Sequence, residues 1–130
     1  MNETIDLMMQ HSSVRNFTDE KIPEHVLKTI VDAGRAPPNW KNFQSYSVIL
    51  VQSQEQKDAI FAQQPQKAIK NCAAFLVFVG DLNRAKIAVE MNGGEFQPEG
   101  VESLLITSVD AAVAGQNTLL AAQSLGYGGV

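Results

Sequence analysis

The sequence predicts an α+β fold, a mostly antiparallel sheet surrounded by helices, with one long central helix at a dimer interface. Two stretches have strand character, "SYSVILVQ" at 45–52 and "AFLVFVG" at 74–80. A helical pattern then continues for about 25 residues after Pro98. Because the chain has 130 residues, we expect residues 1–130 to form a single domain.

Two short helices are expected before the first strand. Ile5, Met8 and Met9 recur at helical spacing and predict a helix that ends near His11. A second helix is expected to start near Pro23, since proline suits the first helical turn, and to stop at Pro37–Pro38. Its apolar stripe is formed by Val26, Leu27, Ile30, Val31 and Gly34.

The two strands and the helix between them have separate signals. Segment 45–52 alternates and then becomes β-branched, which favours a strand. Ser53 followed by Gln56 fits a capping box for a polar helix that reaches about Ala62. The continuous apolar run 74–80 is typical of a strand buried on both faces.

The long helix has small or apolar residues nearly all round, and Gly126 is its expected stop. A helix that is apolar on every side must be surrounded, and a domain of this size supplies few neighbours to a helix about 35 Å long. We therefore expect it to pack against a second copy of the chain. The alternative is a central helix buried within one protomer. The following "GYGGV" is read as a glycine turn that leads into another strand.

Composition narrows the function classes. The net charge is −4 and the ten Lys and Arg residues are scattered, so a nucleic-acid partner is not expected. The single cysteine, Cys72, allows no intrachain disulfide, and a metal site is not expected from two histidines without carboxylates at ligand spacing. The N-terminus has acids where a signal peptide needs bases, and no unbroken apolar run predicts a membrane span. The expected location is cytoplasmic.

The stretch "HSSVRNF" at 11–17 concentrates hydrogen-bonding side chains. If it is extended, His11, Ser13 and Arg15 point one way and Ser12 points the other. An imidazole, a hydroxyl and a guanidinium on one edge suit an anion, above all a phosphate. The alternative is structural: Arg15 pairs with an acidic neighbour, Asp19 or Glu20, a serine caps a helix end, and His11 is solvated.

Three segments resemble the flavin-dependent nitroreductase family, in the order that the family has them. "HSSVRNFTDEKIP" resembles the family's N-terminal signature, and "DAGRAPPNWKNFQSYSVILV" its loop, glutamine and strand. "SVDAAVAGQNTLLAAQSLGYGGV" is similar to its long dimer helix and the turn after it, and "FLVFVGDLNR" fits the NADPH-dependent nitro and flavin reductase subgroup. The resemblance implies a nitroreductase-like domain at 1–130 that lacks the family's C-terminal part.

The resemblance also implies a cofactor and its ligands. The cofactor would be FMN, bound non-covalently at the interface of a homodimer. His11 and Ser13 would contact its phosphate and ribityl chain, with Ser12 beside them, and Arg15 would lie near the N1/O2 edge. Gln66 would bond the pyrimidine edge, with a solvated helix-end glutamine as the alternative. Asn39 would reach the partner's flavin, although the family usually has serine there.

The implied function is an FMN-dependent oxidoreductase. Electrons would pass from NADPH or NADH to nitroaromatics, quinones or free flavin by a ping-pong mechanism. No protein residue is assigned as catalytic. Two alternatives remain open: a flavin- or nucleotide-binding module without turnover, and a small dimerisation domain without a ligand.

Overall fold

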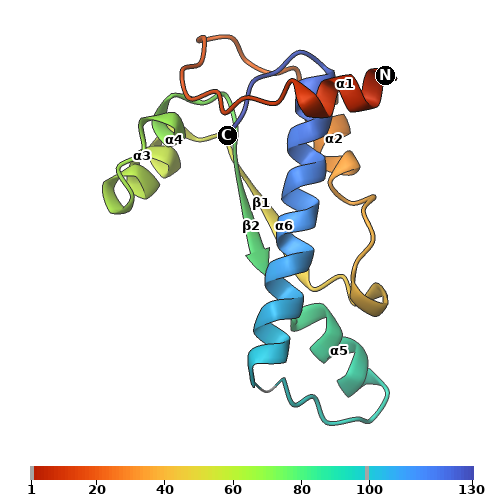
Figure 1. Cartoon of the computed structure of the whole chain (residues 1–130). Helices are drawn as coiled ribbons and strands as arrows, with labels where there is room; N and C mark the ends of the chain where they lie inside the picture. Colours follow the sequence, from red (N-terminus) through yellow and green to blue (C-terminus); the bar gives the residue numbers. More distant parts are fainter. Residues whose placement is uncertain (1, 99) are drawn as a thin grey trace.

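The computed structural model describes residues 2–98 and 100–130, so Met1 and Glu99, both within the expected domain, lie outside the described residues. Seven regular helices and strands precede the long helix that passes along the sheet (Figure 1). In chain order the elements described are α1 (Glu3–Met9), α2 (Glu24–Ala33), the 3-10 helix η1 (Trp40–Asn42), β1 (Tyr46–Val51), α3 (Gln54–Gln63), α4 (Lys67–Asn71), β2 (Phe75–Gly80), α5 (Asn83–Met91) and α6 (Gly100–Ser124).

The sheet is antiparallel, as expected, and among the described residues it has two strands. Tyr46 pairs with Gly80 at one end of the register and Val51 with Phe75 at the other. The expectation that the second strand is buried on both faces is wrong for this chain. Residues of β2 are half-buried, and Val79 is 37% exposed, because in the part described β2 has one strand partner and one long helix, α6, packed on it.

The long helix is confirmed as α6, Gly100–Ser124, and its end follows a Schellman motif. Gly126 has φ +85°, a left-handed conformation that glycine adopts without a steric penalty. Its N–H donates to the carbonyl of Gln123 at 3.0 Å, and the N–H of Tyr127 donates to Ala122 at 3.0 Å. These two bonds satisfy carbonyls that the helix end would leave free.

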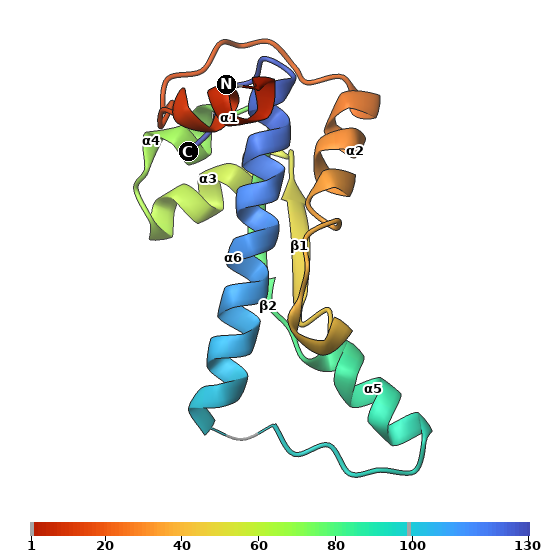
Figure 2. The ribbon, with the colours of Figure 1, turned by 45° about the vertical axis from the view of Figure 1, so that its right-hand side comes forward.

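The two faces of α6 have opposite character. The inward face, which packs on β1, β2 and α2, is small or polar: its buried residues are Thr107, Asp110, Ala111, Ala114 and Thr118. The outward face carries large exposed apolar side chains, which we call the outer stripe: Val101, Leu104, Leu105, Val109 and Val113. Figure 2 shows α6 in front of the sheet. Within the described residues, α6 is also the helix long and apolar enough to cross a membrane.

The first two helices form where they were expected. Asn2 caps α1, because its Oδ1 accepts a hydrogen bond from the N–H of Ile5 at 3.0 Å. Pro23 precedes α2, which buries Leu27 and Ile30 against α6. Its last helical residue is Ala33, four positions before the first of the two prolines.

Two local expectations are corrected, and two short helices are new. Ser53 precedes α3, but its side chain makes no capping hydrogen bond, so the capping box is wrong. Residues 127–130 have no strand assignment. The short helices α4 and α5 were not predicted, since neither has an apolar stripe of useful length: α4 has five residues and α5 buries none of its side chains.

Candidate functional site

A cavity of about 970 Å³ lies where the segment after α1 meets the end of the chain. We call it the Arg15 cavity. Its walls come from segments 14–22 and 126–130, from α6, and from the stretch that leads from α4 into β2. Apolar side chains such as Leu27, Phe75, Phe78 and Leu119 line it beside a few polar ones. Small-molecule sites have this size and this mixture of lining groups.

Backbone contact between distant segments builds one wall of the cavity. The N–H of Val14 donates to the carbonyl of Gly129 at 2.9 Å. A β-carbon on Gly128 would lie 2.9 Å from Val14 Cγ1, so glycine is required for this close approach. Segment 127–130, which the sequence suggested only as a turn and strand, therefore belongs to the candidate site. Its signal was the pair of glycines in "GYGGV".

Arg15 and Gln66 are brought together by the fold, since both line the Arg15 cavity. Gln66 is the residue before α4, and its side chain makes no capping bond. Arg15 is exposed, and within residues 2–98 and 100–130 it has no ion pair with Asp19, Glu20 or any other carboxylate. The alternative that Arg15 pairs with Asp19 or Glu20 is therefore not what the structure shows. A guanidinium without a carboxylate partner is available to an anionic or electron-rich edge of a ligand.

His11, Ser12 and Ser13 are exposed and are not among the residues that line the Arg15 cavity. Nδ1 of His11 lies 2.9 Å from Nε2 of Gln123, which ties the end of α1 to α6. Oε1 of Gln123 is buried and has no hydrogen-bond partner among the described residues. The three residues that were expected to contact a phosphate thus directly precede lining residues in the sequence, but they do not line the cavity themselves.

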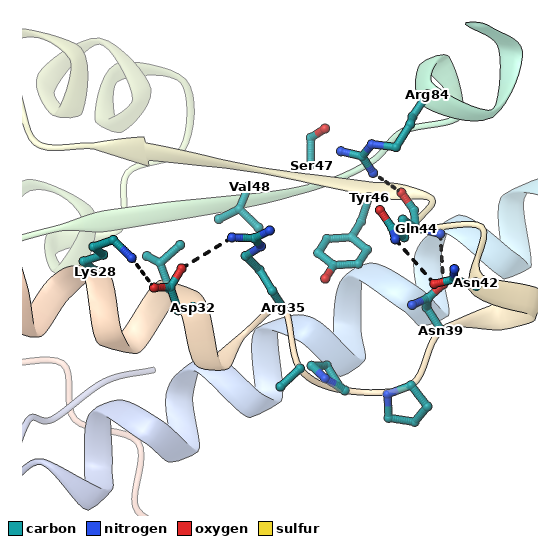
Figure 3. Close-up of a pocket in the computed structure, with 14 residues that line it drawn as sticks. Lys28, Asp32, Arg35, Asn39, Asn42, Gln44, Tyr46, Ser47, Val48 and Arg84 are labelled. Atoms are coloured by element: carbon teal, nitrogen blue, oxygen red, sulfur yellow. Dashed lines mark hydrogen bonds and ion pairs between the residues drawn. The ribbon is translucent and has the colours of Figure 1, made fainter. Parts of the chain in front are cut away.

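Asn39 lines a second hollow of about 1100 Å³, between α2, β1 and the start of α5. Figure 3 shows the residues that line this hollow. Its lining is polar, with Arg35 and Arg84 on opposite sides. Oδ1 of Asn39 accepts from the N–H of Gln44 at 2.9 Å, so this amide closes its own loop. Arg84 donates to the carbonyl of Gln44 at 2.6 Å. The structure therefore places Asn39 apart from Arg15 and Gln66 within one chain.

Ion pairing shapes one side of that second hollow. Lys28 and Arg35 both approach Asp32, and the hydrogen bond from Lys28 is the main cause that lowers the pKa of the Asp32 carboxyl. All three side chains are largely exposed, so these pairs contribute little to stability.

The loop at 39–45 has an unusual backbone. Lys41, Asn42 and Gln44 have φ of 48°, 57° and 50°, a left-handed region that costs a non-glycine residue about 1–3 kcal/mol. Trp40 and Phe43 are 39% and 36% exposed and pack edge to face on each other, with ring centroids 5.7 Å apart. Because both rings are partly exposed, they are available for stacking on a ligand.

Asp110 is a buried carboxylate in the middle of α6. The neighbouring Thr107 does not bond to it, because the Thr107 hydroxyl donates to its own helix backbone. The partners instead come from the 39–45 loop: Ser45 Oγ donates to Asp110 Oδ2 at 2.7 Å and the Trp40 N–H donates to Oδ1 at 3.1 Å.

Cys72 also lines the Arg15 cavity. Burial raises the pKa of its thiol, while the nearby Lys57 ammonium acts in the opposite direction. Lys57 is itself 6% exposed and donates to the carbonyl of Cys72 at 2.7 Å. The raised pKa keeps the thiol protonated at neutral pH, so Cys72 acts as a small apolar lining group.

A comparison with models of known protein families decides the family of this chain. The model of the nitroreductase family matches residues 8–130, nearly the whole chain. The chain belongs to the nitroreductase family. This match confirms the resemblance on which the expected fold and site residues were based. The Arg15 cavity is thus a cavity of a nitroreductase-family chain. Within the described residues, no group of three His, Cys, Asp or Glu side chains could hold a metal ion.

Curated proteins with similar sequences are named as FMN reductases or nitroreductases. The chain is 40% identical to the FMN reductase of Bacillus subtilis whose name specifies NAD(P)H, over all of this chain and 53% of that protein. It is 36% identical to the oxygen-insensitive NADPH nitroreductase of Salmonella typhimurium, again over all of this chain and 53% of the relative. The chain thus spans about half the length of the curated relatives it matches.

Solved nitroreductase structures have the same fold over this region. NfrA2 of B. megaterium superimposes with a TM-score of 0.95 at 35% identity, covering 98% of this chain and 53% of that one. The NADPH:FMN oxidoreductase of Vibrio harveyi, solved in complex with NAD+, gives a TM-score of 0.91 at 33% identity, over 99% of this chain and 55% of that one. The predicted α+β, nitroreductase-like fold is confirmed.

Proposed function

We propose that this chain forms part of an FMN-dependent oxidoreductase that passes electrons from NADPH or NADH to nitroaromatics, quinones or free flavin. The observation that carries the proposal is Arg15, a cation without a carboxylate partner among the described residues, at an otherwise largely apolar cavity of about 970 Å³. The names of the family relatives, which include FMN reductases and NADPH nitroreductases, support the same chemistry.

The residues present fit the ring system of FMN. The cavity offers apolar walls for a flat heterocycle, with the Arg15 guanidinium and the Gln66 amide for its polar edge. When bound, FMN would supply the hydride and electron transfer that protein side chains cannot perform. Arg15 would stabilise negative charge on the ring by an electrostatic interaction, and the apolar walls would exclude water from it.

The phosphate end of the site remains a prediction. His11, Ser12 and Ser13 are proposed to contact the phosphate and the ribityl chain of FMN. Because these three residues do not line the Arg15 cavity, the phosphate end of the cofactor would have to extend beyond that cavity. Asn39 is proposed to contact the flavin held mainly by the other subunit, in keeping with its position away from the Arg15 cavity.

The proposed assembly is a homodimer that buries the outer stripe of α6. Large apolar side chains exposed along one helix are the kind of surface that protein–protein contacts cover, and Leu104 and Leu105 are 65% and 58% exposed. A membrane is the other apolar environment for such a helix. We favour the second subunit because Glu102 and Asp110 lie within α6, and charged groups are costly in lipid. The proposed location is the cytoplasm, with no nucleic-acid partner.

An absorption spectrum of the purified protein tests the cofactor. The expected result is a yellow protein with flavin bands that are bleached anaerobically by NADPH or NADH and restored by a nitroaromatic or quinone. A protein that is colourless and takes up no FMN would refute the proposal. A yellow protein that neither nicotinamide cofactor bleaches would favour a binding module without turnover.

Substitution of Arg15 tests the residue assignment. Arg15→Ala removes the cation, and the loss of a charge-assisted hydrogen bond predicts FMN binding weaker by about tenfold to a hundredfold. Lys86→Ala is the control for loss of a cation, because Lys86 is an exposed cation of α5 that pairs with Glu90 and lines neither hollow. Equal FMN affinities of Arg15→Ala and the wild type, measured by fluorescence titration, would show that Arg15 has no part in binding.

A further inference from the structure

The 39–45 loop has a conformation that its own sequence does not favour. Lys41, Asn42 and Gln44 are non-glycine residues with φ of 48°, 57° and 50°. Asparagine tolerates the left-handed region, but lysine and glutamine persist there only where surrounding contacts determine the backbone. Something outside the three residues must therefore hold the loop in this shape.

Two of the contacts are local or peripheral. Asn39 Oδ1 accepts from the Gln44 N–H at 2.9 Å, which closes the loop on itself, and Arg84 of α5 donates to the Gln44 carbonyl at 2.6 Å (Figure 3). Asn39 is half-buried, whereas Gln44 and Arg84 are exposed. Water competes for hydrogen bonds at exposed positions, so these contacts alone are weak anchors.

The buried anchor is Asp110, in the middle of α6. Its Oδ2 accepts from Ser45 Oγ at 2.7 Å and its Oδ1 accepts from the Trp40 N–H at 3.1 Å. Asp110 is 5% exposed and Ser45 is 0% exposed. The two bonds grip the loop at both ends of the left-handed stretch, 65 and 70 residues away from Asp110 in the sequence.

Asp110 has no ion pair among residues 2–98 and 100–130. Burying a carboxylate without a cation is unfavourable unless its hydrogen bonds are satisfied, and here the backbone of Trp40 and the hydroxyl of Ser45, both in the loop, donate to it. We propose that Asp110 is a positioning residue, which through its two carboxylate oxygens fixes the 39–45 loop in the shape that presents Trp40 and Lys41 to a bound ring. The functional half of this inference rests on the proposed FMN site.

The loop presents a defined surface. The Lys41 ammonium lies 4.4 Å from the centroid of the Trp40 ring, and Phe43 packs against the edge of the same ring. An exposed indole offers a flat face on which another aromatic ring can stack, and the Lys41 ammonium beside it suits an anionic group. If the loop relaxed, Trp40 and Lys41 would lose this arrangement, because both follow the backbone that Asp110 holds.

Trp40 itself supplies the readout, since it is the one tryptophan of the 130-residue sequence. Asp110→Leu keeps the branched shape of the side chain and its number of heavy atoms, and it removes both acceptors. We expect its tryptophan emission to move to longer wavelength and to be quenched more strongly by iodide. Asp110→Asn can still accept from the Trp40 N–H and can donate to Ser45 Oγ, so we expect its spectrum to stay close to that of the wild type. A Trp40→Phe variant identifies the part of the signal that comes from Trp40.

Two further variants separate positioning from general damage. Asp58→Asn is the matched control for loss of charge, because Asp58 of α3 is paired with Lys70 of α4, away from the loop. Ser45→Ala removes one donor without changing α6, and it replaces Asp110→Leu if that variant does not fold by circular dichroism. An unchanged emission and quenching in folded Asp110→Leu, or in Ser45→Ala when it takes that place, would overturn the inference. An equal shift in emission and an equal increase in iodide quenching in Asp110→Asn and Asp110→Leu would also overturn the inference.

FMN titration separates this inference from the proposed function. If the wild type binds FMN, we expect Asp110→Leu to bind about tenfold more weakly, the equivalent of one lost hydrogen bond, and Asp110→Asn to recover most of that affinity. Unchanged FMN affinity of Asp110→Leu would overturn the functional half. If the wild type takes up no FMN, the proposed function and this functional half both fail, and the tryptophan signal alone decides whether Asp110 fixes the loop.

Discussion

Gly34 and Thr118 approach so closely that a β-carbon on Gly34 would lie 2.1 Å from Thr118 Oγ1. Gly34 has φ −65°, an ordinary right-handed value, so its lack of a side chain serves packing and not backbone conformation. Thr118 is 4% exposed, and its hydroxyl donates to the Ala114 carbonyl at 2.8 Å, which limits how far it can move. This contact sets the distance between α2 and α6.

Gly34→Ala should lower the free energy of unfolding by about 1–3 kcal/mol, because the added methyl overpacks the interface between α2 and α6. Urea unfolding of Gly34→Ala, of Thr118→Ala and of the double variant measures the coupling between the two positions. The double variant should recover part of the stability that Gly34→Ala loses. Gly115→Ala is the control: its β-carbon would lie 3.6 Å from Phe78, an ordinary contact. That change should raise stability by about 0.5–1 kcal/mol, because alanine favours a helix interior. Equal effects at Gly34 and Gly115 would contradict the close packing.

Leu105→Glu should convert the proposed dimer into a monomer. Leu105 is 58% exposed on the outer stripe, and a carboxylate buried in an apolar interface without a partner is strongly unfavourable. Sedimentation or light scattering over a range of concentrations gives the mass. Ser124→Glu, at the end of the same helix and outside the stripe, should leave the mass unchanged. A wild-type mass that stays monomeric at every concentration would refute the interface.

Ser47→Ala should raise the pKa of Asp81. The hydrogen bond from Ser47 is the largest cause that lowers this pKa, followed by the backbone N–H of Asn83. A lowered pKa in the folded state means that Asp81 contributes stability at neutral pH, and that this contribution is lost as the pH falls through its folded value. NMR titration of the carboxyl carbon measures the shift. Ser53→Ala, whose side chain makes no capping bond, should leave the titration of Asp81 where it was.

Cys72 should react slowly with iodoacetamide at neutral pH. Burial raises the pKa of its thiol, and the thiolate is the reactive form, so the rate should be below that of free cysteine and should rise only at higher pH. The same measurement in urea provides the control, since unfolding exposes the thiol and should bring the rate to that of free cysteine. A folded protein that reacts as fast as free cysteine would show that Cys72 is not shielded.

Local sequence signals determined most of the secondary structure of this protein. Helical spacing, the stop at Gly126 and the β-branched runs act within a few residues of one another, so α1, α2, both strands and α6 could be predicted from the chain alone. The ordered motifs also sufficed to recognise the nitroreductase family. The short helices α4 and α5 escaped prediction because neither carries an amphipathic stripe that a period could reveal.

Tertiary structure alone decided which distant residues meet. Arg15 and Gln66 line one cavity, Asn39 lines another, and Asp110 bonds to a loop 65 to 70 residues away. No periodicity encodes such contacts, since they depend on how α6 packs against the sheet and α2. Sequence composition showed α6 as apolar all round, whereas packing divided it into a small, polar inward face and a large, apolar outward one. The physical reason is that close approach to the sheet admits only small side chains, which leaves the large ones pointing away from it.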